Sequence, residues 1–277
     1  MTLLLRDVVA ALEGLYPPST AQSWDQVGLV SGDPDQPVER ILLALDPTLA
    51  VIEEARERHA DLIVTHHPLL MRGIHSVATT SAKGASVTGL IVGDIALYVA
   101  HTNADVAAAG VCEALASAAG LSDTRPLAVV EDQPLGRVGR LPTPTTLADF
   151  ATSLYAGLPA SAAGLRVAGP ADAVVQTVAV VGGAGDDQFA AVRASGADVY
   201  VTADLRHHPA LEAREEARGG RPYLVDAGHW SSEAVWLPTL ADALASALRV
   251  DVDIDISTVR TDPWTFTVGA TTAGGTP

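Results

Sequence analysis

Histidines gather where predicted strands end, and this placement is the first sign of chemistry in the sequence. The run ADLIVTHHPLL (60–70) has the pattern of a buried strand that stops at His66 and His67. The segment YVAHTNAD follows a second strand pattern and places His101 four residues before Asp105. Ligands of open α/β sheets bind beyond the carboxyl ends of the strands, so these side chains lie where a binding site is expected.

Two further segments repeat this placement in the second half of the chain. GHWSSE puts His229 and Glu233 at positions i and i+4, so a helix that begins there points both side chains the same way. Another strand pattern is followed by Asp204 and then by the pair His207 and His208. That pair has three interpretations: it orients a ligand residue, it contacts substrate, or it is plain surface.

Imidazole and carboxylate groups in one place are typical ligands of zinc, iron, manganese or nickel. A carboxylate can bridge two ions while imidazoles bind each one, so these segments predict two divalent ions about 3.5–4 Å apart. Ions held in this way make water a nucleophile near neutral pH. The spacing alone leaves open whether His101 or Asp105 is the ligand in its segment.

Each motif alone also has an ordinary structural explanation. A histidine pair at a strand end serves other purposes in many proteins. The segment HTNAD can cap a helix through Asn103 or Asp105, and GHWSSE can form a capping box with Glu233 as its acid. The three motifs together, each after a predicted strand, favour the metal site.

Two loops have two interpretations each. The run VVGGAGDD (180–187) joins a strand to a helix, and it fits either an anion site at the helix start or a tight turn. In the loop SWDQVGLVSGDP (23–34), Asp25 either orients a ligand histidine or caps a turn. Few groups near the site are suited to hold phosphates. They are Arg72, Lys83, Arg206 and the backbone of residues 182–185.

The composition limits the possible partners. The 277 residues carry a formal net charge of −16, which disfavours long nucleic acids as partners. The single cysteine, Cys112, excludes intrachain disulfides and cysteine-rich zinc sites. The apolar start of the chain is interrupted by Arg6 and Asp7, and no run reaches the ~18 apolar residues of a membrane span. We therefore expect a cytoplasmic protein without membrane contact.

Strand and helix patterns alternate along the chain, which predicts an α/β fold with mostly parallel or mixed sheets covered on both faces. The segment 121–145 is rich in proline, glycine and turn formers, so we place a boundary there. The predicted units are a first lobe, 1–125, and a second lobe, 126–277. In one arrangement compatible with this division, the last helix packs back on the first lobe. Residues 269–277 are predicted to be a disordered tail.

Taken together, these motifs resemble the dinuclear-metal hexameric family of GTP cyclohydrolase 1 type 2 homologues. The resemblance spans nearly the whole chain, through SWDQVGLVSGDP, DLIVTHHPLL, YVAHTNADVAAAGV, VAVVGGAGDD, ADVYVTADLRHH and LVDAGHWSSE. It implies two interlinked α/β/α lobes, a metal site in the cleft between them and a homohexamer. It also selects Asp105 over His101 and implies five metal ligands: His66, His67, Asp105, His229 and Glu233, the last shared by both ions.

The implied function is metal-dependent hydrolysis of a small-molecule substrate such as a nucleotide, with water attacking C8 of guanine. His101, Asp25 or His208 would then move protons. The alternatives are a metal-dependent phosphoesterase and a metal-handling or regulatory scaffold without catalysis. The chain resembles the compact members of the family, and it departs from the usual pattern at GVCEAL (110–115) and at TAD (202–204).

Overall fold

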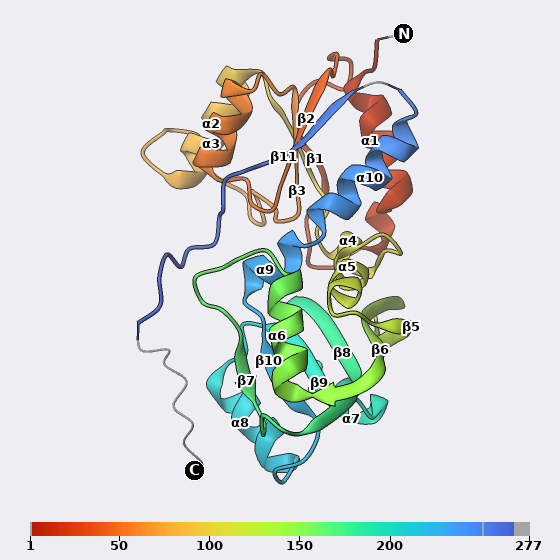
Figure 1. Cartoon of the computed structure of the whole chain (residues 1–277). Coiled ribbons are helices and arrows are strands. Elements are labelled where there is room, and N and C mark those ends of the chain that lie inside the picture. Colours follow the sequence, from red (N-terminus) through yellow and green to blue (C-terminus); the bar gives the residue numbers. More distant parts are fainter. Residues whose placement is uncertain (1, 251, 269–277) are drawn as a thin grey trace.

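A computed structural model describes residues 2–250 and 252–268, and it contains two mixed β-sheets with helices on both faces of each. One sheet lies above the other in Figure 1. The α/β class and the mixed sheets agree with the sequence prediction, whereas the predicted tail, 269–277, falls outside the described residues. Within the described ranges, no helix is both long and apolar enough to cross a membrane.

The first sheet has the strand order β1-β4-β3-β2-β11, and all its neighbours are parallel except β1 and β4. Its strands are β1 (Gly28–Ser31), β2 (Arg40–Ala44), β3 (Leu62–Thr65), β4 (Ala96–Val99) and β11 (Asp253–Ile256). Helices α1 (Leu5–Leu15) and α10 (Leu237–Leu248) pack on one face, and α2 (Leu49–Glu57) and α3 (Ala82–Gly93) on the other. The central strands β2, β3 and β4 are buried on both faces, as their continuous hydrophobic runs predicted, whereas the edge strand β11 alternates aspartate with isoleucine.

The second sheet has the order β5-β6-β8-β9-β10-β7, with the parallel strands β8, β9 and β10 at its centre. Its strands are β5 (Ser122–Val130), β6 (Gln133–Thr146), β7 (Arg166–Ala168), β8 (Val174–Ala184), β9 (Val199–Ala203) and β10 (Tyr223–Asp226). Helices α5 (Val111–Ala118) and α6 (Leu147–Gly157) cover one face, and α7 (Phe189–Ser195) and α8 (His207–Glu216) the other. The short elements η1 (Pro18–Thr20), α4 (Thr102–Val106) and α9 (His229–Ala234) complete the fold.

The segment 121–145 differs from the turn-rich connection that its composition suggested, because it forms most of the long hairpin β5–β6. β5 is an edge strand, where Pro126 is tolerated. The turn consists of Glu131 and Asp132, both with left-handed backbone angles (φ 47° and 64°). This geometry suits a two-residue hairpin turn, but neither residue is the glycine that usually marks one.

The chain crosses between the two sheets more than once. After the second sheet is complete, α10 packs beside α1, and β11 pairs with β2 in the first sheet (Figure 1). The division at 125/126 stays a prediction. The crossing matters for the site because α9, which immediately precedes α10, is held at the junction of the two sheets.

Candidate metal centre

The first sheet brings polar side chains to one edge at the carboxyl ends of three adjacent parallel strands. Asp46 follows β2, His66 and His67 follow β3, and His101 follows β4. The three strands are in register, so these residues end at nearly the same level of the sheet. Helix α4 begins directly after His101 and carries Asp105 back toward this edge.

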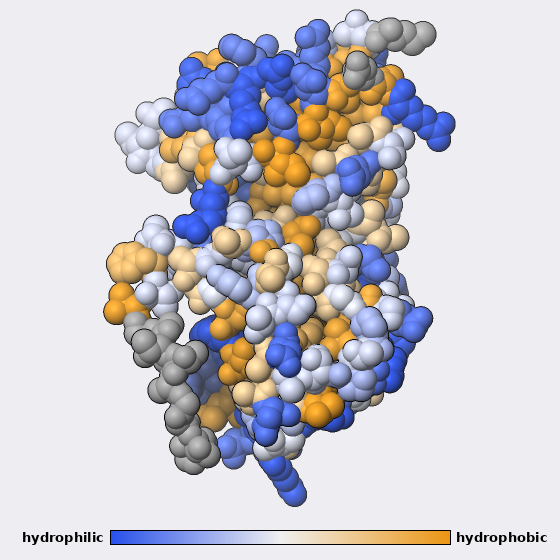
Figure 2. Space-filling model, in the orientation of Figure 1, coloured by the Kyte–Doolittle hydropathy of each residue, from blue (hydrophilic) through white to orange (hydrophobic). Residues whose placement is uncertain are grey.

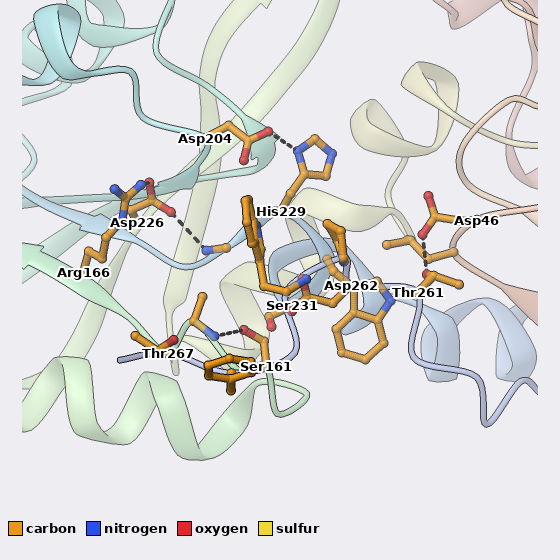
Figure 3. A pocket seen from close by; sticks show the side chains of 18 of the residues that line it. Asp46, Ser161, Arg166, Asp204, Asp226, His229, Ser231, Thr261, Asp262 and Thr267 are labelled. Atoms are coloured by element: carbon orange, nitrogen blue, oxygen red, sulfur yellow. Dashed lines mark hydrogen bonds and ion pairs between the residues drawn. The ribbon is translucent and has the colours of Figure 1, made fainter. Parts of the chain in front are cut away.

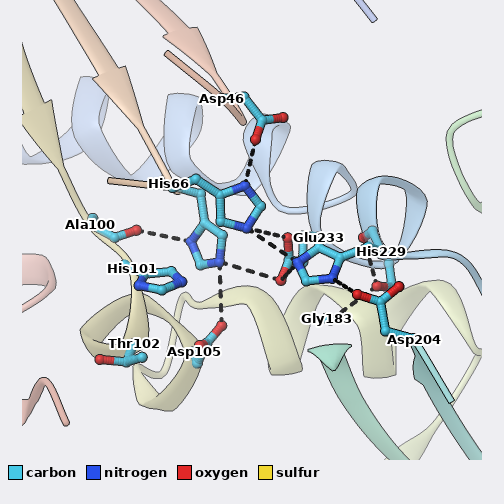
Figure 4. A network of polar contacts seen from close by, with 12 residues as sticks. Asp46, His66, Ala100, His101, Thr102, Asp105, Gly183, Asp204, His229 and Glu233 are labelled. Carbon is cyan, nitrogen blue, oxygen red and sulfur yellow. Dashed lines mark hydrogen bonds and ion pairs between the residues drawn. The ribbon is translucent and has the colours of Figure 1, made fainter. Parts of the chain in front are cut away.

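The second sheet supplies the opposite side of the same site. Asp204 follows β9, and α9 starts after β10 with His229 and Glu233 one turn apart. Because β9 and β10 are parallel, these residues also lie at carboxyl ends of strands. Side chains from both sheets thus meet at the junction (Figure 4).

Four histidines at this junction share one arrangement: each Nδ1 contacts an oxygen acceptor. The partners are the Ala100 carbonyl for His66 (2.9 Å), Asp46 for His67 (2.7 Å), Asp25 for His101 (2.9 Å) and Asp204 for His229 (2.7 Å). A carbonyl or carboxylate oxygen accepts a hydrogen bond from Nδ1–H, which fixes the tautomer of a neutral imidazole and leaves a lone pair on Nε2. Carboxylates or carbonyls behind metal-bound histidines commonly have this role.

The Nε2 atoms converge on Glu233, the centre of the network in Figure 4. The Glu233 carboxylate lies 3.0 Å from His67 Nε2, 3.2 Å from His229 Nε2 and 3.6 Å from His66 Nε2. The Nε2 atoms of His67 and His229 face each other at 3.3 Å. Ligand atoms of His67, His229 and Glu233 form one compact group, and those of His66, His67 and His101 form a second.

Two buried polar atoms here have no hydrogen-bond partner among the described residues. They are His66 Nε2 and Asp105 Oδ1, which lie 3.7 Å apart. Buried polar groups are normally satisfied, and an exception calls for an explanation such as an ion. The donor set of imidazole and carboxylate fits divalent ions of the zinc, iron, manganese or nickel type.

Burial and mutual charge shift the pKa values of these groups strongly. Burial lowers the pKa of His66, and burial together with the Glu233 charge raises that of Asp105 well above its usual range. Burial also opposes ionisation of Glu233, but the surrounding histidines outweigh it and hold that pKa well below normal. Such opposed shifts in one small cluster are typical of functional sites.

The pKa values of His67 and His229 are raised, whereas that of His66 is lowered. Burial disfavours their charged forms, but hydrogen bonds to carboxylates prevail and raise the pKa of His67 to about 10 and of His229 to about 9. The carboxylates are Asp46 and Glu233 for His67, and Glu233 and Asp204 for His229. Without a metal, these pKa shifts favour the charged imidazoles, but the facing Nε2 atoms, 3.3 Å apart, leave room for one proton between them.

The glycine run 180–187 is where the backbone of β8 comes closest to Glu233. Gly183 has φ +64°, and a Cβ at this position would lie 2.2 Å from Glu233 Oε1. Its backbone N–H donates to Ser232 Oγ, and its carbonyl accepts from Thr202. Neither interpretation offered for this run accounts for Gly183, which lies within β8: glycine is needed there because the Glu233 carboxylate occupies the space that a side chain would fill.

The structure brings the five implied ligands together, and it also brings His101 beside them. One oxygen of Asp25 contacts Nδ1 of His101, which is not one of the five implied ligands, and the other accepts from the backbone N–H and hydroxyl of Thr102 at the start of α4. These hydrogen bonds act against burial and hold the pKa of Asp25 well below its usual range. His208 is exposed on α8 next to His207, away from the contacts of the cluster.

Sequence reasoning missed the contribution of Asp46 and assigned no role to Asp204. Both directly follow strands, as the histidines do, and this position was the available signal. Neither lies in a motif with a spacing typical of metal ligands. Their function depends on contacts across the fold, which local spacing does not reveal.

Comparison with known proteins is consistent with this geometry. The model of the family described as Duf34/NIF3 (NGG1p interacting factor 3) matches residues 3–263. A Streptomyces coelicolor protein named GTP cyclohydrolase 1 type 2 homolog is 46% identical, covering 96% of this chain and 95% of the relative. A Mycobacterium tuberculosis protein of the same name is 34% identical over 373 aligned residues, covering 95% and 97%, so it contains residues that this 277-residue chain lacks.

Solved structures share the fold. A Staphylococcus aureus hypothetical protein superposes with a TM-score of 0.88 at 29% identity, covering 96% of this chain and all of the other. A Bacillus cereus protein related to NIF3 gives the same TM-score at 26% identity with the same coverage.

Proposed function

The chain belongs to the Duf34/NIF3 family, and from this premise we propose that it is a metal-dependent hydrolase with two divalent ions per chain. The proposed ligands are His66, His67, Asp105, His229 and Glu233. One observation carries the proposal: His66, His67 and His229 each have Nδ1 on an oxygen acceptor and Nε2 within 3.6 Å of the Glu233 carboxylate. Lone pairs and buried carboxylates that converge in this way are stabilised by cations.

Divalent ions in such a site lower the pKa of water and polarise a substrate oxygen or nitrogen. The protein's own contribution is to fix the ligands and to handle protons. Asp46 and Asp204 hold the rings of His67 and His229, and Glu233 lies between the two histidines. His101 Nε2 is the proposed proton carrier, because Asp25 holds its Nδ1 and orients the ring.

The proposed substrate is a nucleotide ring, and this part rests on the name of the relatives. In the reaction that this name implies, water attacks C8 of guanine and the imidazole ring opens. The chain would have to bind the ring near the metal centre and pass one proton to or from the reacting nitrogen. His101 is in a suitable position for that transfer, whereas His208 lies apart on the exposed start of α8.

The test combines metal analysis with turnover on a single preparation. We expect about two ions per chain, as a two-metal site requires, together with consumption of GTP. Asp105→Ala and Glu233→Ala should each lose at least one ion while circular dichroism shows an intact fold. Asp242→Ala, which removes a carboxylate of α10 away from the cluster, is the matched control and should keep both ions.

Each outcome has a definite meaning. Full metal content in both site variants would exclude the proposed ligand set. Two ions without GTP turnover would leave the metal centre in place and favour the phosphoesterase, tested with phosphate esters, or the metal-handling scaffold. The homohexamer and the cytoplasmic location remain predictions, and light scattering on the purified protein tests the former.

A further inference from the structure

A cavity of about 810 Å³ opens beside the metal centre. His67 and His229 are among its lining residues, so whatever fills it can reach the proposed ions. Figure 3 shows that its other walls come from distant parts of the chain, among them Ser161, Arg166 and Asp226 of the second lobe and Thr261 near the C-terminal end. This size suits a small organic molecule.

One wall of the cavity is the C-terminal segment 257–268, which runs from the first lobe to the second. Glu54 of α2 accepts hydrogen bonds from Thr258 at 2.9 and 3.0 Å. Further along, Thr261 donates to Asp46, the same carboxylate that holds His67. Thr267 then donates to the Ala162 carbonyl of the second lobe at 2.5 Å. The segment is thus fastened at both ends, and one of its contacts connects it to a proposed ligand.

This wall presents aromatic surface to the cavity. Trp264 and Phe266 line it together with Trp230. Trp264 is 68% exposed and Phe266 75% exposed, so these rings are not used to fill the core. In Figure 2 the segment stands off from the body of the molecule, carries apolar side chains and has a hollow beside it. Exposed aromatic rings beside a cavity are suited to stack on a planar ligand.

The remaining walls are acidic. Asp46, Asp204, Asp226 and Asp262 all line the cavity. Among the described lining residues, Arg166 is the only lysine or arginine, and its guanidinium is paired with Asp226. Asp46 and Asp204 lie at the metal centre, and Asp226 is compensated by Arg166, so the lining away from the metal centre carries the negative charge of Asp262 with no cation of the described lining to offset it. This charge disfavours negative groups of a ligand there. Three side chains were suggested above as groups that could hold phosphates, and none of them lines the described cavity: Arg72, Lys83 and Arg206.

We propose that this cavity binds a planar, nitrogen-containing ring that is neutral or cationic, stacked on Trp264 and directed toward the metal centre. The proposal rests on the proposed function for the presence of the metal ions, but the walls that select the ring belong to this chain alone. Negatively charged groups of a ligand can bind favourably only where the proposed metal ions lie. Trp264 is accordingly a specificity residue, and a polyphosphate contributes little to binding along the acidic walls.

Calorimetric titration of the metal-loaded full chain with two nucleosides tests the proposal. Guanosine is neutral, whereas 7-methylguanosine, titrated below neutral pH so that it keeps its N1 proton, has nearly the same shape and a net positive charge on its imidazolium ring. We expect 7-methylguanosine to bind about threefold tighter, because a cation gains from the aromatic face and the acidic walls. Trp264→Ala should weaken both roughly tenfold, as the loss of a stacking ring does. Tyr155→Ala removes an exposed aromatic ring of α6 outside the cavity and should change neither.

Three results would overturn the proposal: no binding of either nucleoside at millimolar concentration, unchanged binding by Trp264→Ala, or weaker binding of the charged nucleoside than of guanosine. Metal analysis of the same samples separates this proposal from the proposed function. Two ions without nucleoside binding would contradict the ring site and leave the metal centre intact. Trp264-dependent nucleoside binding by a chain that takes up no metal would support the ring site and contradict the hydrolase.

Discussion

Replacing Gly183 by alanine should change two measurable quantities by different mechanisms: the free energy of unfolding and the affinity for metal. Gly183 has φ +64°, where alanine costs about 1–2 kcal/mol because its Cβ crowds the backbone. The new Cβ would also lie 2.2 Å from Glu233 Oε1. That oxygen is the far end of a side chain, so it can move aside without disrupting the fold. Its movement removes it from the point where the histidines converge.

The expected magnitudes follow from this difference. Unfolding by urea should show a loss of about 1–2 kcal/mol, which is the backbone contribution. Metal affinity should fall at least about 100-fold, since even a change in the residues behind the ligands costs 10–100-fold. Gly196→Ala is the matched control, because Gly196 also has a positive φ (+73°) and a Cβ added there would meet no atom of the described chain within 4 Å.

The assay is urea unfolding of both variants with a chelator, followed by metal titration. Gly196→Ala should show a similar loss of stability and unchanged metal affinity. If Gly183→Ala bound metal as tightly as the unmodified chain, the close approach of β8 to Glu233 would have no role in the site. If both variants lost metal equally, the effect would come from general destabilisation, and the reasoning would be refuted in that case too.

Two other predictions concern the histidines and their acceptors. Asp46→Asn should lower metal affinity about 10–100-fold, because the ring of His67 loses its charged acceptor. Competition with a fluorescent chelator measures the affinity, and a value within about twofold of the unmodified chain would contradict the prediction. Carboxylates raise the pKa of His67 to about 10 and that of His229 to about 9, whereas metals bind neutral imidazole. Metal binding should therefore release protons, and metal affinity should rise with pH until these pKa values are passed. Calorimetry in buffers of different ionisation enthalpy detects this release, and a heat independent of the buffer would argue against it.

The sequence predicted the cluster of histidines and carboxylates because these residues follow strands. His66 and His67 were recognisable, since an apolar run that ends in two histidines has no simple packing explanation. The contribution of Asp46 was not recognisable, because its role depends on the register of β2 beside β3. The choice between His101 and Asp105 could not be made from spacing, and the structure shows why: both side chains lie at the cluster.

The fold was predictable in class and less so in detail. Alternating strand and helix patterns gave the α/β architecture, because buried parallel strands require continuous apolar runs. The hairpin β5–β6 was obscured by its prolines and by a turn without glycine, since edge strands and left-handed Glu131 and Asp132 do not show in local composition. The pairing of β11 with β2 joins segments about two hundred residues apart, and no local pattern specifies such a contact.

That pairing has a consequence for the order of events during synthesis. β2 emerges early from the ribosome, but its outer neighbour, β11, is made only near the end of the chain. Until then the first lobe has an open strand edge and lacks the cover of α10, so it is exposed to aggregation. His229 and Glu233 also precede α10 directly. The proposed metal cluster is therefore assembled at the last step of folding, and a truncated chain that lacks α9 onward would have neither the outer strand β11 nor two of the five proposed ligands.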